Sequence, residues 1–132
     1  MKTRFCLALL LLCATASAQV CVNKTDHRRL NQAALESLQV KKVNSRAEDW
    51  RLDAKEVAAR ELAPLVKADA KLVKAHLIPL PGKDVHIQSF ALTNGKTSYT
   101  ITVQKLAFLL PYSGTYPMMM WTVTELKTAC GK

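Results

Sequence analysis

The sequence lacks the short motifs that mark many enzymes. It has no Gly-x-Ser-x-Gly turn, no His-Glu-x-x-His helix, no Cys-x-x-Cys pair and no glycine-rich phosphate loop. The three histidines, at positions 27, 76 and 86, are far apart, and no two have the spacing of metal ligands on one element. Active sites also assemble from scattered residues, so these absences favour a binding protein over an enzyme without excluding catalysis. They indicate no metal and no cofactor.

Long apolar segments are also missing. The main one, Cys6–Cys13, is far shorter than the roughly 20 residues that span a bilayer. It follows Lys2 and Arg4 and precedes Ala-Thr-Ala-Ser-Ala, which ends at Ala18 in a small-x-small pattern. A positive segment, an apolar segment and small residues in this order predict a signal peptide over residues 1–18. We therefore expect a soluble protein without a transmembrane segment, secreted to the extracellular space or to a bacterial periplasm.

Cysteine is scarce outside the predicted signal. Cys6 and Cys13 leave with it, so only Cys21 and Cys130 remain in the mature chain of 114 of the 132 residues. Two cysteines in an oxidising compartment predict a disulfide. Because one bridge cannot form a knottin-like framework, a hydrophobic core must hold the fold together.

Acidic residues are too few to balance the basic ones. Loss of Lys2 and Arg4 lowers the formal net charge from +9 to +7. This charge favours solubility, and as an alternative it indicates an anionic partner such as nucleic acid, another anionic polymer or a membrane surface. No internal repeat is present, and residues 19–132 have the length of one domain. Asn23-Lys24-Thr25 is an N-glycosylation sequon, relevant in a eukaryotic source.

The first half of the mature chain has the apolar spacing of helices. One helix is predicted over residues 26–43, and a second begins at the capping box Ser45-Arg-Ala-Glu48. The inward face of the second helix is predicted to carry Trp50, Ala54, Val57, Ala58 and Leu62. Pro64 kinks or ends the second helix, and a third covers residues 65–78.

The second half has the alternation of strands. Val85–Leu92 and Thr97–Gln104 flank Asn94-Gly95, a strong hairpin signal. A two-residue turn pairs Phe90 with Tyr99, whereas a three-residue turn with a bulge pairs Ala91 with Tyr99. Turn chemistry favours the first pairing and the apolar count favours the second, so the register stays open.

A third strand is predicted over Met118–Leu126. The expected fold is therefore an α+β domain with two or three N-terminal helices packed on an antiparallel sheet of three to four strands. One disulfide joins its termini.

The leading candidate for a binding surface is the segment 111–117, which proline bounds at both ends and which contains Tyr112 and Tyr116. Tyrosine is favoured at protein contact surfaces, and loops on a scaffold commonly carry function. We therefore expect a binding or inhibitory protein that engages an unknown protein partner through this segment.

The predicted third helix offers two alternatives. Lys67, Lys71 and Lys74 share one face, which is either a solvated surface or a binding surface for anionic polymers and membranes. Asp69 and His76 lie on the opposite, apolar face. They are either ordinary hydrogen-bonded side chains or part of the acid–base site of a small hydrolase, completed by His86 or Glu125 from the sheet.

The end of the chain resembles one known family. Pro111-Tyr112-Ser113-Gly114, followed by a predicted strand and Cys130, is similar to the proline-tryptophan hairpin of the cystatin-like proteins. These are secreted proteins in which an antiparallel sheet wraps around an early helix. Tyrosine stands where the family has tryptophan, and the central Gln-x-Val-x-Gly loop is absent. The resemblance is confined to residues 111–130 and does not assign the family.

Overall fold

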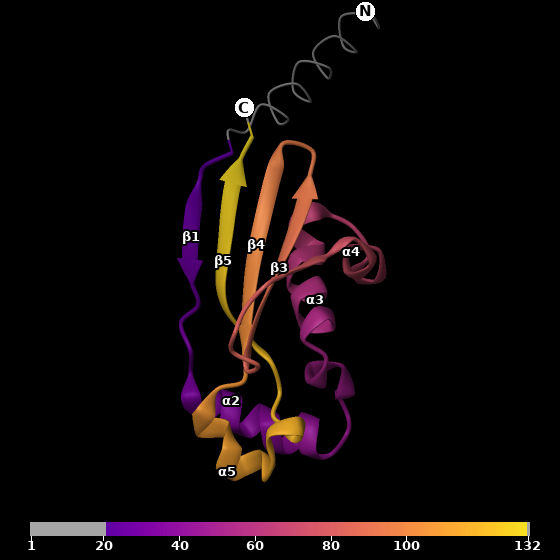
Figure 1. The fold of residues 1–132 in the computed structure, drawn as a ribbon. Coiled ribbons are helices and arrows are strands. Elements are labelled where there is room, and N and C mark those ends of the chain that lie inside the picture. Colours follow the sequence, from indigo (N-terminus) through magenta and orange to yellow (C-terminus); the bar gives the residue numbers. More distant parts are fainter. Residues whose placement is uncertain (1–20, 132) are drawn as a thin grey trace, which may run out of the picture.

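The computed structural model describes residues 21–131, so the predicted signal peptide lies outside the described residues. The fold is an antiparallel five-stranded sheet in the order β1-β5-β4-β3-β2, with helices on one side and at one end (Figure 1). The elements are β1 (Lys24–His27), α2 (Gln32–Leu38), α3 (Ala54–Val66), α4 (Ala70–His76), β2 (Ile78–Leu80), β3 (Ile87–Asn94), β4 (Thr97–Gln104), α5 (Leu110–Ser113) and β5 (Thr122–Cys130). A π-helical turn (Gln39–Asn44) and 3₁₀ turns (Asp49–Leu52, Ala107–Leu109, Tyr116–Met118) connect them.

The predicted α+β class is confirmed, but the number and order of its elements differ from the prediction. The sheet has five strands, and α5 follows β4 instead of preceding the sheet. The two unpredicted strands, β1 and β2, are short, exposed edge strands. β1 overlaps the start of the helix expected over residues 26–43, and β2 contains Pro79, which a sheet tolerates at an edge. Neither strand has the apolar alternation by which strands are recognised.

The hairpin of β3 and β4 has a register that neither expected turn gives. Asn94 pairs with Thr97, so the turn residues are Gly95 and Lys96, and Phe90 lies opposite Ile101. Gly95 has a φ of 63°, as glycine at the first central position of a type II′ turn does. The register is shifted by two residues from the Phe90–Tyr99 pairing. A shift by two residues leaves each side chain on the same face of the sheet, so Phe90 still points into the core.

The core has two parts. The main part lies between α3 and the sheet, where Val57, Ala58 and Leu62 pack with Phe90 and Ile101. These helix positions are among those that the helical periodicity placed inward. A second cluster lies where Figure 1 shows α2 and α5 together at one end of the sheet, and it comprises Val43, Leu109, Met119 and Met120.

Helix α3 starts and ends at positions that differ from the expectation. Its N-cap is Asp53, which accepts hydrogen bonds from the backbone of Lys55 (3.0 Å) and Glu56 (3.2 Å). The Ser45 hydroxyl instead donates to the carbonyl of Lys41, so it does not cap a helix. Pro64 lies inside α3 without ending it, and the helix stops at Val66 because Lys67 takes a left-handed conformation with a φ of 53°.

The predicted disulfide is confirmed. Cys21 and Cys130 are bonded, with a Cα–Cα distance of 5.8 Å across 109 residues of sequence. Within the described chain, no helix is both long enough and apolar enough to span a membrane.

Candidate functional site

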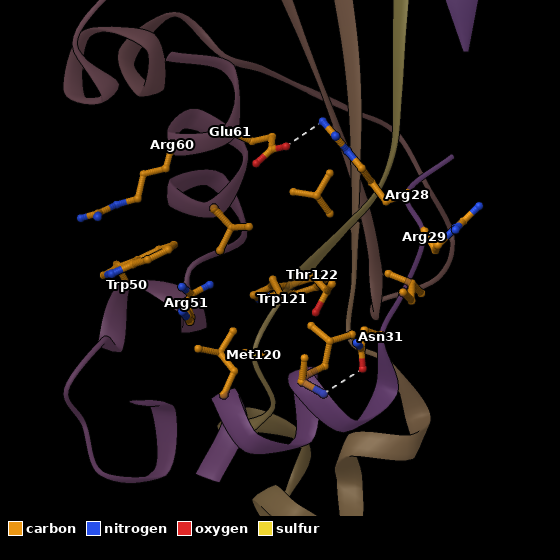
Figure 2. Close-up of a pocket in the computed structure, with 16 residues that line it drawn as sticks. Arg28, Arg29, Asn31, Trp50, Arg51, Arg60, Glu61, Met120, Trp121 and Thr122 are labelled. Atoms are coloured by element: carbon orange, nitrogen blue, oxygen red, sulfur yellow. Dashed lines mark hydrogen bonds and ion pairs between the residues drawn. The ribbon is translucent and has the colours of Figure 1, made fainter. Parts of the chain in front are cut away.

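A cleft of about 530 Å³ opens between α2, α3 and the start of β5 (Figure 2). The segment that joins β1 to α2 closes one side of it, and Arg28 from this segment reaches across toward Glu61 on α3. Small-molecule sites commonly have volumes of about 300–1,000 Å³. The cleft is therefore large enough to hold a small organic molecule.

The wall of the cleft is largely apolar. Val57, Met120 and Trp121 are each at least nine-tenths buried, and they line it from α3 and from the segment that leads into β5. Leu35 and Leu38 add apolar surface from α2. Both tryptophans of the chain, Trp50 and Trp121, line this cleft, so intrinsic fluorescence reports on it directly.

Two arginines stack on Trp50 at one end of the cleft. The guanidinium carbons of Arg51 and Arg60 lie 4.2 and 4.1 Å from the centroid of the Trp50 ring. Arg51 also pairs with Glu48 at 2.8 Å, and Arg60 with Glu56 at 3.3 Å. These contacts fix the two side chains at the edge of the cleft, where Figure 2 shows them gathered around Trp50.

Arg28 lies on the other side of the cleft, between two carboxylates. Its Nη2 is 2.6 Å from Glu61 and its Nη1 is 3.4 Å from Asp26. Its Nε is buried and has no hydrogen-bond partner, as is also true of Oγ1 of Thr122. No other side-chain nitrogen or oxygen in the described residues is recorded in this state. An unpaired buried polar atom costs about 1–3 kcal/mol, so both mark places where a bound polar group would be favourable.

Gln39 holds the end of the cleft wall in place. Its side chain is fully buried, and its Nε2 donates to the carbonyl of Met118 (2.7 Å) and to Oδ1 of Asn44 (3.0 Å). Its Oε1 accepts from the backbone N–H of Met120 (2.9 Å). Trp121, the next residue, donates its backbone N–H to the carbonyl of Arg51 (2.9 Å). These hydrogen bonds position the tryptophan in the cleft.

The segment 111–117 consists of the end of a short helix and the start of a 3₁₀ turn, joined by the non-helical residues Gly114 and Thr115. Tyr112 lies in α5 and Tyr116 in the 3₁₀ turn after it, and their exposed fractions are 42% and 44%. The Tyr116 ring stacks on His86 at 4.4 Å, and a hydrogen bond with Glu36 raises the pKa of Tyr112 above 10.0. Because residues 110–113 form α5, this segment does not form the turn of a β-hairpin.

Lys105 connects Tyr116 with Trp121. Its Nζ donates to the carbonyl of Tyr116 (2.8 Å) and lies 5.1 Å from the centroid of the Trp121 ring. Burial lowers the pKa of this lysine. Lys105 therefore contacts both the segment with the exposed tyrosines and a tryptophan of the cleft.

The three lysines predicted to share a helix face do not do so. Lys67 ends α3 in a left-handed conformation, whereas Lys71 and Lys74 belong to α4. The helix is interrupted because Asp69 caps a new one, accepting from the backbone N–H of Lys71. Lys74 lies 2.9 Å from Asp53 and 3.3 Å from Glu56, so acidic neighbours already compensate its charge.

The ion pair of Asp53 and Lys74 joins α3 to α4, and its contribution to the stability of the fold depends on pH. Burial alone raises the pKa of Asp53, but hydrogen bonds from Lys74 and from the backbone of Glu56 and Lys55 outweigh it and hold the pKa below 3.8. A carboxylate with a depressed folded-state pKa stabilises the fold above its unfolded pKa, and the contribution is lost as the pH falls through the folded value.

Asp53→Asn removes this carboxylate but keeps a side chain that can cap α3. We expect it to lower the free energy of unfolding at pH 7 by no more than about 1 kcal/mol, because the pair is exposed. The difference from the wild type should shrink as the pH falls below 3.8. Urea unfolding over a range of pH measures it, and a difference that stays constant down to about pH 2 would contradict the assignment.

The residues considered for acid–base chemistry do not converge. His76 Nδ1 lies 2.9 Å from the carbonyl of Leu72, and Asp69 is the cap of α4. Glu125 pairs with His27 at 3.3 Å. Among residues 21–131, no three histidine, cysteine, aspartate or glutamate side chains are grouped so that they could hold a metal ion.

Asn23 is exposed next to the disulfide. Its Oδ1 accepts a hydrogen bond from the backbone N–H of Cys130 at 2.6 Å. Its place on the surface leaves room for a glycan, and glycosylation at this sequon stays a prediction.

No family model, curated protein or solved structure matches this chain, so its function is argued from the geometry of the cleft.

Proposed function

We propose that this protein is a secreted binding protein that holds a small, largely apolar ligand in the cleft between α2, α3 and β5. The observation that carries the proposal is the composition of the cleft. Apolar residues and both tryptophans make up more than half of its lining, and two buried polar atoms without partners lie beside it. Apolar concave surfaces with a few placed polar groups are typical of sites for small molecules. Secretion is supported by the predicted signal peptide and agrees with the disulfide.

Apolar burial provides the driving force. Each Å² of apolar ligand surface removed from water contributes about 25 cal/mol, so a ligand that buries about 300 Å² gains on the order of 7 kcal/mol before the entropy cost of binding. The side chains around Trp50 are already held by ion pairs, so little ordering of the protein is needed. Because 7 kcal/mol corresponds to a dissociation constant of about 10 μM before that cost is subtracted, we expect dissociation constants from about 10 μM into the millimolar range.

Filling the cleft should weaken binding. Ala34 and Ala33 are neighbouring exposed residues of α2, but only Ala34 lines the cleft. We expect Ala34→Phe to weaken binding of the neutral dye N-phenyl-1-naphthylamine at least about tenfold, and Ala33→Phe to leave it within about twofold. Dye fluorescence and quenching of the tryptophans measure the binding. Absence of saturable binding to the wild type, or equal effects of the two substitutions, would contradict the proposal.

A second candidate is a protein partner that docks on Tyr112 and Tyr116. The observation that favours it is their exposure, with the Tyr116 ring held by its stack on His86. Rigid aromatic side chains of this kind are common at protein interfaces.

Replacing both tyrosines with alanine tests this second candidate. The double variant should lose about 1 kcal/mol of stability or less, because both side chains are exposed. It should also lose capture of a partner from the native extracellular fluid. The variant with phenylalanine at both positions is the control that retains the rings. A strongly destabilised alanine variant that still captures the partner would show that the tyrosines serve the fold instead.

A further inference from the structure

The arginines around the cleft have little free charge. Four of them line it, and three are paired with carboxylates: Arg28 with Asp26 and Glu61, Arg51 with Glu48, and Arg60 with Glu56. The fourth, Arg29, is exposed, so water and salt screen its charge. A count of arginines alone would indicate an anion site, but these pairs remove most of the positive field.

Arg28 shows the consequence most clearly. The guanidinium group and its two carboxylates carry a formal net charge of −1, and Glu61 is only 2.6 Å from Nη2. The atom that remains without a partner, Nε, is a donor and requires an acceptor. A ligand carboxylate at this position would approach Glu61 and be repelled, whereas a carbonyl or hydroxyl oxygen accepts the hydrogen bond without that cost.

Arg51 and Arg60 do not change this balance. Both are held on the Trp50 ring as well as by their acids, so an anion would have to compete with two contacts at each guanidinium group. Thr122, at the start of β5, adds a hydroxyl that can donate to or accept from a neutral polar group. The polar contacts that the cleft offers are therefore those of an uncharged molecule.

We infer that the cleft selects an electrically neutral apolar molecule that carries a hydrogen-bond acceptor, such as a long-chain alcohol, aldehyde or ester, over the corresponding organic anion. The inference rests on the proposed function and names the ligand class of the same site. The hydrocarbon part packs on the partly exposed leucines that line the cleft, Leu30, Leu35 and Leu38, and the oxygen accepts from Nε of Arg28 or bonds to the hydroxyl of Thr122. Both polar atoms are buried, so a ligand oxygen must displace neighbouring side chains to bond to either of them.

Three probes of one chain length test the selectivity. Decanol, methyl decanoate and decanoate displace N-phenyl-1-naphthylamine from the mature, oxidised protein at pH 7.5. We expect the two neutral probes to bind about tenfold more tightly than decanoate. Their affinities should change less than about twofold between roughly 0.02 and 0.5 M NaCl, because no net charge is neutralised on binding.

Glu61→Gln provides the sharper comparison. It removes one of the two acids that balance Arg28, so the ratio of the decanoate affinity to the decanol affinity should rise about tenfold. Glu125→Gln is the matched control, because it removes the same charge from the opposite face of the sheet, next to buried Leu126. It should leave both affinities unchanged. If the Glu61 variant does not fold, the comparison of the three probes on the wild type still tests the preference for neutral ligands.

The outcomes separate this inference from the proposed function. Wild-type binding of decanoate that equals or exceeds that of the neutral probes, and that weakens with salt, overturns the inference and leaves the cleft as a ligand site. Failure of all three probes to displace a dye that does bind also overturns it. If the dye does not bind at all, the proposed function fails together with the inference.

Discussion

Replacing both Cys21 and Cys130 with serine should lower the free energy of unfolding by about 4–5 kcal/mol. The bridge spans 109 residues, and in the chain-entropy model a loop of about 100 residues contributes this amount by restricting the unfolded chain. Urea unfolding of the double variant beside the oxidised wild type measures the difference. A loss below about 1 kcal/mol would show that the unfolded chain gains little freedom when the bridge is removed.

The loss of the bridge should also weaken ligand binding. β1 has four exposed residues and pairs only with β5, so the disulfide beside it is a main anchor of the N-terminal segment. Arg28 follows β1 directly and donates its backbone N–H to Thr124 on β5 (2.9 Å). We expect the serine variant to bind the dye more weakly than the wild type even where both are folded. Unchanged affinity would mean that β1 holds Arg28 in place without the bridge.

Gln39→Leu should have the second largest effect on stability, about 3–5 kcal/mol. The side chain is fully buried, and the substitution leaves the carbonyl of Met118 and the N–H of Met120 without their partners. Each unpaired buried group costs about 1–3 kcal/mol. The same change at Gln32, an exposed residue of α2 that bonds only to Glu36, is the matched control and should cost less than about 1 kcal/mol.

The effect of Gln39→Leu should extend to the cleft. Gln39 accepts a hydrogen bond from the backbone N–H of Met120, and Trp121 is the next residue. The variant should therefore shift the tryptophan emission spectrum and weaken dye binding in the folded state. Thermal unfolding and fluorescence of both variants measure these effects. If Gln39→Leu is as stable as Gln32→Leu, the three hydrogen bonds do not hold this segment.

Sequence patterns predicted the parts of the fold that depend on strong local signals or on simple chemistry. The helical spacing of Val57, Ala58 and Leu62 identified the buried face of α3, and the two remaining cysteines identified the bridge. The edge strands β1 and β2 lack such signals, because exposed strands need no apolar alternation. β1 pairs with β5, which is distant in sequence, whereas β2 pairs with β3, the next strand along the chain.

The hairpin shows how one residue type can suggest a turn without fixing its position. The Asn94-Gly95 dipeptide marked the turn correctly, but Gly95 occupies the first central position and Asn94 is the last strand residue. This register gives glycine the positive φ and keeps Phe90 and Leu92 in the core. Because a shift of two residues leaves every side chain on the same face, packing of these residues selects the face but does not distinguish this register from the Phe90–Tyr99 pairing.

The candidate site was not predicted from the sequence. Its arginines and tryptophans come from the segment after β1, the turn before α3, α3 itself and the segment before β5, so no single stretch contains the pattern. The one local signal was the pair Trp50-Arg51. Its role in the site becomes visible only when Arg60, from the following helix α3, stacks on the same tryptophan ring. The exposed lysines drew attention instead, although the charge of Lys74 is compensated by Asp53.

Titration of the ¹⁵N-labelled protein with decanol tests the central claim most directly, because the two indole N–H signals come from Trp50 and Trp121 alone. If the cleft is the ligand site, both indole signals should shift with one dissociation constant, together with the amides of Leu35 and Thr122, while the amides of Tyr112 and Tyr116 move little. Saturable shifts confined to residues outside the cleft, or no shifts with any of the three probes or the dye, would contradict the account.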